Sequence, residues 1–261
     1  MVPVYQAAPS DIERFSLAQS CARLDPRRRV VLIGPEGLDL SAYRHAVARF
    51  EWMPFHPASF ASIQAYSRLL LSPGFYRAFE PHEFMLVLQT DALVLRDELD
   101  VWTRRPFDYV GAPWPTPVEL FVNLDRHAGA NGLRVRATNG NGGLSLRRIA
   151  ACIDLLAEFP QAHEMFVRTG SSEDLFFALL GSVSTRFVLP NEMTAARFAL
   201  EIDPRRYHAM LGAAPMGCHA WWKYDAEYWV EQLGPAAAQA AALLAAQRAS
   251  MARPVPTARA A

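Results

Sequence analysis

The chain has 261 residues with 26 basic and 26 acidic side chains, and its sequence pI is near 7.1. This charge balance excludes the broad basic surface of a nucleic-acid-binding protein, and three widely spaced cysteines exclude a disulfide framework and a zinc ribbon. The first twenty residues lack the apolar segment of a signal peptide, and the longest helix-like apolar run is too short to span a bilayer. We therefore expect a cytoplasmic protein without a transmembrane segment, whose membrane contact, if any, is peripheral, at the inner face.

Strand-like and helix-like segments alternate along the first hundred residues. Residues 1–28 give weak signals and predict an N-terminal arm or a short helix. After them, apolar runs bounded by Gly or Pro predict strands, and apolar residues at helical spacing behind a Ser or Asp predict helices. The predicted strands are 29–34, 50–55 and 83–95, and the predicted helices are 38–50 and 59–79, the latter interrupted at 72–74.

The second half continues with shorter elements. A Pro/Asn/Gly-rich stretch at 115–132 predicts a long loop, and the "NGNGG" of residues 139–143 predicts a turn into a short strand. Further helices are predicted at 97–105, 148–159, 171–181 and 224–233, further strands at 107–113 and 185–190, and an Ala-rich helix with a frayed tail at 236–261. Basic residues between 115 and 136 leave open whether this region is a lid over a ligand or a solvated surface: Arg126, His127, Arg134 and Arg136.

This alternation of strands and helices predicts an α/β fold whose sheet is mostly parallel in its first half. We divide the chain into an N-terminal arm at 1–28, one globular domain at 29–235, and a helix with a tail at 236–261. In such sheets, ligands bind beyond the carboxyl ends of the strands. The polar residues 89–91 interrupt the apolar run "LVLQTDALVL". Because burying an unpaired carboxylate is costly, we expect this triplet to face a ligand cleft.

Several familiar catalytic motifs are absent from the sequence. "NGNGG" is not followed by Gly-Lys-Ser/Thr and lacks the spacing GxGxxG, and neither GxSxG nor HExxH occurs. P-loop, classical dehydrogenase, Ser-hydrolase and zincin chemistry are therefore excluded. Four separated polar points remain, at Asp91, 139–143, 171–174 and 217–222.

The order and content of these points resemble a group of poorly characterised bacterial domains of the GT-A glycosyltransferase type. The resemblance covers residues 60–222 and is specific only as an ensemble. The positions that carry it are Tyr66, Arg68, Ser72, Gln89, Asp91, 108–114, 140–147, Glu173, Asp174 and 217–219. It implies a GT-A-like (nucleotide-diphospho-sugar transferase) fold, which is a Rossmann-like mixed sheet flanked by helices in a single domain.

The resemblance also implies an activity. We expect a metal-dependent, inverting glycosyltransferase that moves a sugar from a nucleotide-sugar, most simply a UDP-sugar, to a hydroxyl of a saccharide or glycolipid, as in surface polysaccharide biosynthesis. In the resembling enzymes an Asp-x-Asp segment holds a divalent cation against the diphosphate, where negative charge develops. Here Gln89 replaces the first Asp, and Asp91 with His219 would hold Mn²⁺ or Mg²⁺. The alternatives are a turn-capping Asp and a core His bonded to backbone.

Other positions receive roles by the same resemblance. Gln89 and Thr90 would contact the donor. The glycine-rich segment with Asn141, Gly142 and Gly143 would border the donor sugar and the acceptor, since glycine allows close approach; a hairpin turn is the alternative. Asp174 would take a proton from the acceptor hydroxyl and Glu173 would bind acceptor hydroxyls. Acids at a helix start behind a Ser cap can also be purely structural.

The remaining candidates are less specific. Arg68 would neutralise the diphosphate, or lie on a solvated helix face. Trp114 would stack on a sugar ring, or pack in the core. Arg147 and Arg148 would face phosphates or start a helix, with at least one of them in solvent.

Two other functions compete with sugar transfer. A non-catalytic carbohydrate- or nucleotide-binding module on the same fold is credible because the first acid is missing, and it predicts binding that ignores EDTA and the loss of Asp174. A nucleotidyltransferase or hydrolase acting on nucleotide-sugars would consume the donor without a saccharide acceptor.

Overall fold

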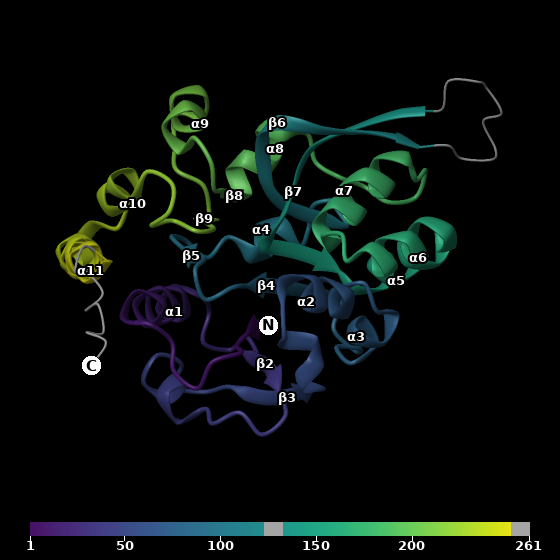
Figure 1. Ribbon diagram of the computed structural model, residues 1–261. Coiled ribbons are helices and arrows are strands. Elements are labelled where there is room, and N and C mark those ends of the chain that lie inside the picture. The colour runs from purple at the N-terminus through teal and green to yellow at the C-terminus, as the bar shows by residue number, and fades with distance from the viewer. Residues whose placement is uncertain (123–132, 252–261) are drawn as a thin grey trace, which may run out of the picture.

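The computed structural model of the protein describes residues 1–122 and 133–251 (Figure 1). Its strands are β1 (Val2–Pro3), β2 (Val31–Pro35), β3 (Glu51–Phe55), β4 (Phe84–Leu88), β5 (Leu93–Val94), β6 (Tyr109–Val122), β7 (Leu133–Arg148), β8 (Ala199–Leu200) and β9 (Gly217–Cys218). Its α-helices are α1 (Asp11–Arg23), α2 (Ile63–Leu70), α3 (Pro73–Arg77), α4 (Leu99–Trp102), α5 (Ile149–Glu158), α6 (Pro160–Thr169), α7 (Glu173–Val183), α8 (Glu192–Phe198), α9 (Pro204–Leu211), α10 (Ala226–Gln232) and α11 (Ala237–Met251). Short 3-10 turns are η1 (Ser41–His45), η2 (Pro57–Phe60) and η3 (Gly234–Ala236).

The strands form a mixed sheet, as the sequence predicts. β1, β2 and β3 are parallel neighbours, whereas β7 pairs antiparallel with both β4 and β6. The two groups meet at Met1, whose backbone nitrogen donates to the carbonyl of Leu86 (2.9 Å) and whose carbonyl accepts from the nitrogen of Leu88 (3.0 Å). A smaller ladder of β5, β9 and β8 lies beside them. The parallel first half is confirmed.

Alternating residues of the strands supply two cores. Val31 and Ile33 of β2 and Val87 of β4 join the cluster that packs against α2, α3, α5, α6 and α7, whereas Leu32 and Leu88 join the cluster under η1 and α4. Because successive side chains of a strand point to opposite faces, β2 and β4 contribute to a core on each side of the sheet. Figure 1 shows this layering, with the sheet between the two groups of helices.

Residues 1–28 are part of the folded body rather than a peripheral arm. β1 extends the sheet, and α1 buries Ile12 and Phe15 in a third cluster with α10 and α11. The indole nitrogen of Trp221 donates to the Ser16 hydroxyl (2.8 Å) within that cluster. The predicted terminal helix is α11, and the tail at 252–261 lies outside the described residues. No helix in the described part of the chain is long and apolar enough to cross a membrane.

The clearest correction concerns the hairpin of β6 and β7. The sequence predicts a loop at 115–132 and a turn at 139–143, but β6 continues to Val122 and the glycine-rich segment lies inside β7. Prolines along β6 are tolerated because the register shifts between Val110 and Ala112 and again between Pro113 and Val118. Residues 123–132, with Arg126 and His127 of the predicted lid, lie outside the described residues.

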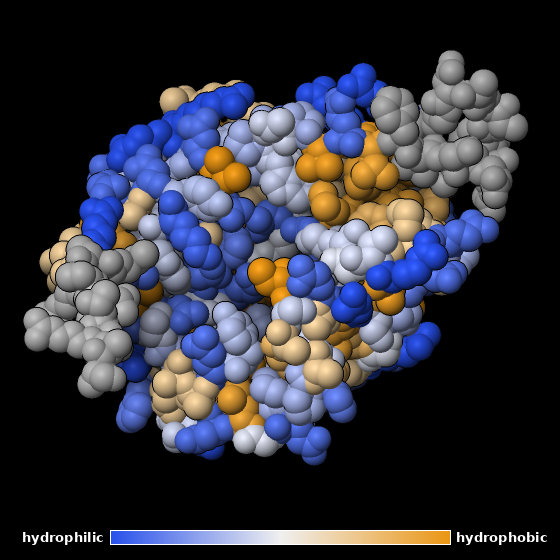
Figure 2. All heavy atoms as spheres, in the orientation of Figure 1, coloured by the Kyte–Doolittle hydropathy of each residue, from blue (hydrophilic) through white to orange (hydrophobic). Residues whose placement is uncertain are grey.

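Two smaller differences follow from local chemistry. Residues 185–190 form no strand. The backbone nitrogen of Asp108 donates to the carbonyl of Val188 (2.9 Å), but the nitrogen of Val188 donates to the Asp108 side chain (2.8 Å), so no regular pairing with a strand follows. The helix predicted at 38–50 is reduced to η1. In Figure 2 the visible face is mainly hydrophilic, with hydrophobic residues gathered where the β6–β7 hairpin meets α7.

Candidate functional site

The polar triplet predicted to face a ligand lies just past the carboxyl end of β4. β4 ends at Leu88, and the chain then turns, with the backbone nitrogen of Gln89 donating to the carbonyl of Gly143 (2.9 Å) and that of Ala92 to Gln89 (2.9 Å). β5 resumes at Leu93. The turn therefore presents Asp91 at the edge of the sheet where α/β proteins bind ligands.

His219 meets Asp91 there, although 128 positions separate them in the sequence. The short strand β9 carries the chain past β5 and places the His219 Nε2 atom 3.1 Å from Asp91 Oδ1 and 3.1 Å from Gln89 Oε1. Lys223 Nζ lies 2.8 Å from the other carboxylate oxygen of Asp91. The side chains of Asp91 and His219 are only 16% and 13% exposed. The structure thus brings together the two metal ligands that the resemblance implies.

Glu201 completes this cluster and is missed by the sequence reasoning. It follows β8, and its Oε1 atom lies 3.3 Å from His219 Nδ1. Asn141 donates to its other oxygen, and the Asn141 Oδ1 atom accepts from the nitrogen of Gly143 (3.1 Å). A carboxylate behind an imidazole fixes the orientation of the ring. The signal in the sequence is an acid directly after the apolar run "RFAL", the same pattern that marks Asp91.

The charges of the cluster are strongly coupled. Burial opposes an imidazolium at His219, but hydrogen bonds and charge from Asp91 and Glu201 outweigh it and raise its pKa to about 9. Burial likewise opposes ionisation of Asp91, yet His219 and Lys223 hold the pKa of that carboxyl well below its usual range. At neutral pH an imidazolium therefore lies between two carboxylates.

The donor atoms fit a divalent cation only in part. Over residues 1–122 and 133–251, no three His, Cys, Asp or Glu side chains form a metal cage. Asp91 Oδ1 and Gln89 Oε1 nevertheless both lie 3.1 Å from His219 Nε2. A carboxylate, an amide oxygen and an imidazole suit Mn²⁺, with other ligands supplied by phosphate oxygens. A cation at His219 would displace the proton from that ring.

Two glycines of β7 make room for this cluster. A Cβ atom on Gly143 would lie 2.2 Å from the His219 ring, and one on Gly142 would lie 2.8 Å from Glu173 Oε1 and 3.4 Å from Asp174 Cβ. Because real Cβ atoms do not approach so closely, only glycine allows β7 to run between His219 and α7. The glycines of this segment thus allow close approach to the protein's own side chains, and contact with a donor or an acceptor stays a prediction.

Replacing Gly143 by Ala should reduce the affinity for a divalent cation by about 10–100-fold, the usual effect of disturbing an orienting contact. The added methyl group would push the imidazole of His219 away from Asp91 and Gln89. Titration of the purified variant with Mn²⁺ in the presence of nucleoside diphosphate measures this. The matched control is Gly74→Ala, whose added Cβ meets nothing closer than 3.4 Å; equal affinities in both variants would contradict the assigned role of Gly143.

Asp174 lies on the other side of the same backbone segment. It starts α7, and the backbone nitrogen of Gly142 donates to its Oδ2 atom (3.3 Å). Its Oδ1 atom accepts from the Ser172 hydroxyl and from the nitrogen of Leu175 (2.7 Å). Ser172 is at the cap position, but its hydroxyl accepts no hydrogen bond from the helix backbone. The hydroxyl donates to Asp174 instead.

Burial, followed by the charge of neighbouring Glu173, raises the pKa of Asp174 to about 6. The folded protein thus binds this proton more tightly than the unfolded chain, in which the value is 3.8. Stability from the neutral carboxyl is complete below pH 3.8 and is lost as the pH rises to about 6. A group in this range is suited to accept a proton near neutral pH.

An Asp174→Asn variant cannot lose that proton. Its free energy of unfolding relative to the native protein should therefore rise between pH 4 and pH 7, by up to about 3 kcal/mol. Urea unfolding of both proteins at several pH values measures the difference. Asp154→Asn, an exposed helical aspartate, is the control, and parallel pH curves for Asp174→Asn and native protein would show that Asp174 titrates normally.

Glu173 occupies a different place from the one the sequence predicts. It is 6% exposed, its Oε1 atom accepts from Arg147 Nη2 (3.1 Å) and its Oε2 atom accepts from the Ser67 hydroxyl (3.2 Å). Arg147 is fully buried and also donates to the Tyr76 hydroxyl (3.1 Å). With both oxygens engaged, Glu173 anchors α7 rather than an acceptor.

Three further candidates lie around the site or apart from it. The Thr90 hydroxyl donates to Glu13 Oε1 (2.6 Å), which ties the turn to α1. Trp114 packs its ring against Gly140, beside Asp174. Arg68 is exposed and donates to the carbonyl of Val167 (2.9 Å), so in this structure it contacts α6 rather than the Asp91 cluster.

Arg148 differs from the solvent position considered for it. Its Nε atom donates to Asp108 Oδ1 (2.9 Å), it also pairs with Glu83, and its guanidinium lies over the ring of Phe84. Neither it nor Arg147 reaches the polar turn after β4. Both arginines therefore stabilise the fold.

The chain shares the fold of GT-A glycosyltransferases, as the alignment with one solved structure at a TM-score of 0.50 shows. An active-site mutant of LgtC aligns with 98% of this chain and 98% of its own, at 16% identity and a TM-score of 0.50. The galactosyltransferase LgtC in complex with donor and acceptor sugar analogs covers 94% and 96% at 16% identity and 0.49. Mouse xyloside xylosyltransferase 1 covers 84% of this chain and 95% of its own at 10% identity and 0.49. The predicted fold class is confirmed.

The chain belongs to the family described as protein of unknown function DUF5672, whose pattern matches residues 49–219. That range includes the first three polar points singled out in the sequence and ends at His219, within the fourth. Comparison with proteins of curated function finds no match.

Proposed function

We propose that the protein is a metal-dependent glycosyltransferase that uses a nucleotide-sugar, with a UDP-sugar as the first candidate, and a hydroxyl of a saccharide or glycolipid. The observation that carries the proposal is the meeting of Asp91, Gln89 and His219 past the end of β4, with Asp174 across Gly142 and Gly143. The GT-A fold makes this edge of the sheet the expected place for a donor.

Asp91 and His219 would hold Mn²⁺, or Mg²⁺, together with the donor diphosphate. The cation, when bound, supplies positive charge that stabilises the departing nucleotide. Lys223, which is half exposed and lies 2.8 Å from Asp91, would turn from that carboxylate to a phosphate oxygen. Glu201 would keep the imidazole of His219 oriented from behind.

The nucleoside would lie toward the N-terminal segment. Tyr5 is 58% exposed and lines a small pocket together with Glu13 and Thr90, the residue before Asp91. An exposed aromatic ring beside a cation site is suited to stacking on a base. With its amide oxygen on the cation, Gln89 would contact the donor sugar or ribose through its amide nitrogen.

Asp174 would act as the base at its Oδ2 atom. Its Oδ1 atom already accepts two hydrogen bonds, whereas Oδ2 accepts a single long one from Gly142. That oxygen is therefore the one left to take the proton of an acceptor hydroxyl. A carboxylate that acts as general base on the face of the sugar opposite the departing nucleotide gives inversion at the anomeric carbon. Trp114, packed beside Asp174, would contact the acceptor ring.

Calorimetric titration of the purified protein with UDP, GDP and dTDP, each with Mn²⁺ and again with EDTA, tests the proposal. We expect one diphosphate to bind tightly with Mn²⁺ and at least tenfold more weakly with EDTA, since the cation bridges protein and phosphate. Asp154→Asn should behave as the native protein. Equal affinity with Mn²⁺ and with EDTA would favour a non-catalytic binding module. If no nucleotide bound, the proposed donor site would be wrong and only the assignment of the fold would stand.

A further inference from the structure

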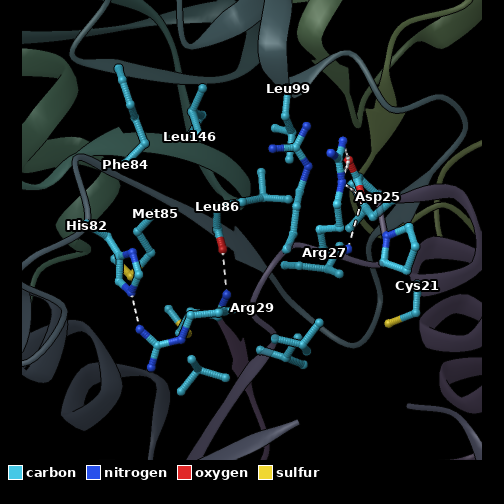
Figure 3. Close-up of a pocket in the computed structure, with 18 of the residues that line it drawn as sticks. Cys21, Asp25, Arg27, Arg29, His82, Phe84, Met85, Leu86, Leu99 and Leu146 are labelled. Atoms are coloured by element: carbon cyan, nitrogen blue, oxygen red, sulfur yellow. Dashed lines mark hydrogen bonds and ion pairs between the residues drawn. The ribbon is translucent and has the colours of Figure 1, made fainter. Parts of the chain in front are cut away.

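A large hollow lies alongside β4, and residues of this strand from Phe84 to Leu88 line it. Its volume is about 1020 Å³, near the upper limit of small-molecule sites. It extends from the first residues of β2 and β4 to the carboxyl end of α1 and to α4 (Figure 3). Phe84 and Leu86 line it, whereas Gln89 and Asp91 of the same chain segment do not. A ligand here would be separate from the donor site.

The floor of this hollow is apolar. It lies on the sheet face that η1 and α4 cover only in part, and Phe84 and Leu86 are accordingly half-buried. Aliphatic residues from several elements and their flanks line it, among them Val2, Leu24, Val31, Leu86, Leu88, Leu99 and Leu146. Apolar walls of this extent are stabilised when an apolar group displaces water from them.

The rim carries four arginines. Arg27, Arg28, Arg29 and Arg49 line the hollow, and so do two aspartates, Asp25 and Asp100. Figure 3 shows Arg29 with His82 on one side and Arg27 with Asp25 on the other.

Three of the four guanidiniums are held in place by carboxylates. Arg27 pairs with Asp25, Arg28 with Asp97 and Asp100, and Arg29 with Glu51. Arg49 is exposed and has no ion-pair partner among residues 1–122 and 133–251. The rim therefore offers one uncompensated guanidinium beside three positioned ones, an arrangement suited to a carboxylate or phosphate.

We propose that this hollow binds a single-chain amphiphile with an anionic head group, its chain on the Leu86–Leu146 floor and its carboxylate or phosphate at Arg49. The guanidinium of Arg49, which lacks an ion-pair partner among the described residues, and the apolar floor complement the two halves of such a molecule. The site is independent of the proposed sugar transfer, because no residue assigned to that reaction lines it.

Cys21 provides a reporter for occupancy. It lies on the wall of the hollow and is partly exposed, whereas Cys152 and Cys218 are buried elsewhere. The experiment measures the rate at which N-ethylmaleimide labels Cys21, by mass spectrometry, in the full-length protein. The added compounds are decyl phosphate, decanoate, decanol and inorganic phosphate, each below any micelle concentration.

We expect decyl phosphate or decanoate, or both, to slow labelling by about tenfold or more, and decanol and inorganic phosphate to leave it unchanged. The two anionic compounds distinguish a phosphate from a carboxylate head group. Arg49→Glu should weaken the protection by about tenfold, since it removes a charge-assisted hydrogen bond. Arg168→Glu, an exposed arginine on α6, is the control and should retain it.

Four results would overturn the proposal. Protection by none of the compounds would show that no amphiphile binds, and equal protection by decanol would show that the charge is not recognised. Protection by inorganic phosphate alone would reduce the site to a free-anion site. The fourth result is slow labelling of Cys21 even without an added compound, in a protein that is dimeric by size-exclusion chromatography. This pair of observations would identify a second copy of the chain as the occupant. None of these readouts depends on glycosyl transfer.

Discussion

Replacing Asp91 by Asn is expected to lower turnover of the nucleotide-sugar by about 10²–10³-fold or more while the protein stays folded. Asn keeps the size of the side chain but loses the negative charge that faces both His219 and Lys223. The cation would then lose its only anionic protein ligand in the cluster around His219 Nε2. Release of nucleoside diphosphate from the donor identified by calorimetry measures the effect.

Circular dichroism and thermal unfolding serve as the control for that variant, since the site lies at the edge of the sheet and not in a core. Asp154→Asn should keep full turnover. If Asp91→Asn retained native turnover with native Mn²⁺ dependence, Asp91 would not be a metal ligand. The proposal for this turn would then be wrong.

Replacing Arg147 by Met should destabilise the protein by about 3–5 kcal/mol, because it leaves the carboxylate of Glu173 buried without a cation. Arg147 is fully buried between Tyr109 and Phe177, with its guanidinium 5.0 and 5.7 Å from their ring centres. In the part of the chain that the structure describes, Glu173 is the only residue whose carboxylate forms an ion pair with it. Chemical unfolding followed by fluorescence gives the free energy.

The double variant Arg147→Met/Glu173→Gln should recover part of this loss, since it removes both charges and leaves neutral groups that can still hydrogen-bond. The exposed pair of Arg186 and Glu158, at 3.7 Å, supplies the comparison. Arg186→Met should cost less than about 1 kcal/mol. A double variant as unstable as the single one would indicate that packing of the long arginine side chain, and not its charge, is what stabilises this core.

The sequence predicts the element that positions the site better than it predicts the site's members. The interruption of an apolar run at 89–91 marks the end of β4 because a polar triplet has no place inside a two-sided core. Glu201 carries only a weak signal, a single acid directly after a short apolar run, and Lys223 carries none. Only the pairing of β9 with β5 and β8 brings Glu201 beside His219 and Lys223 beside Asp91.

The hairpin and Arg147 escape sequence reasoning for a different reason. Local composition indicates a loop wherever Pro and Gly are dense, yet β6 absorbs its prolines through register shifts and β7 uses its glycines for contact with α7 and His219. An arginine next to a predicted helix start is usually solvated. Here it is buried because Glu173, Tyr76 and Ser145 together satisfy its guanidinium, and a network of this kind is visible only in three dimensions.

The backbone of Gly142 and Gly143 lies against Asp174 on one side and against His219 on the other. In the proposed reaction, the spacing between the departing and the attacking groups is therefore set by one rigid strand and not by a mobile loop. Substitutions that change the choice of donor could then be made without changing the residues that carry out the transfer. Changes at Tyr5, which is exposed, would redirect the choice of sugar nucleotide, whereas β7 itself offers almost no freedom to vary.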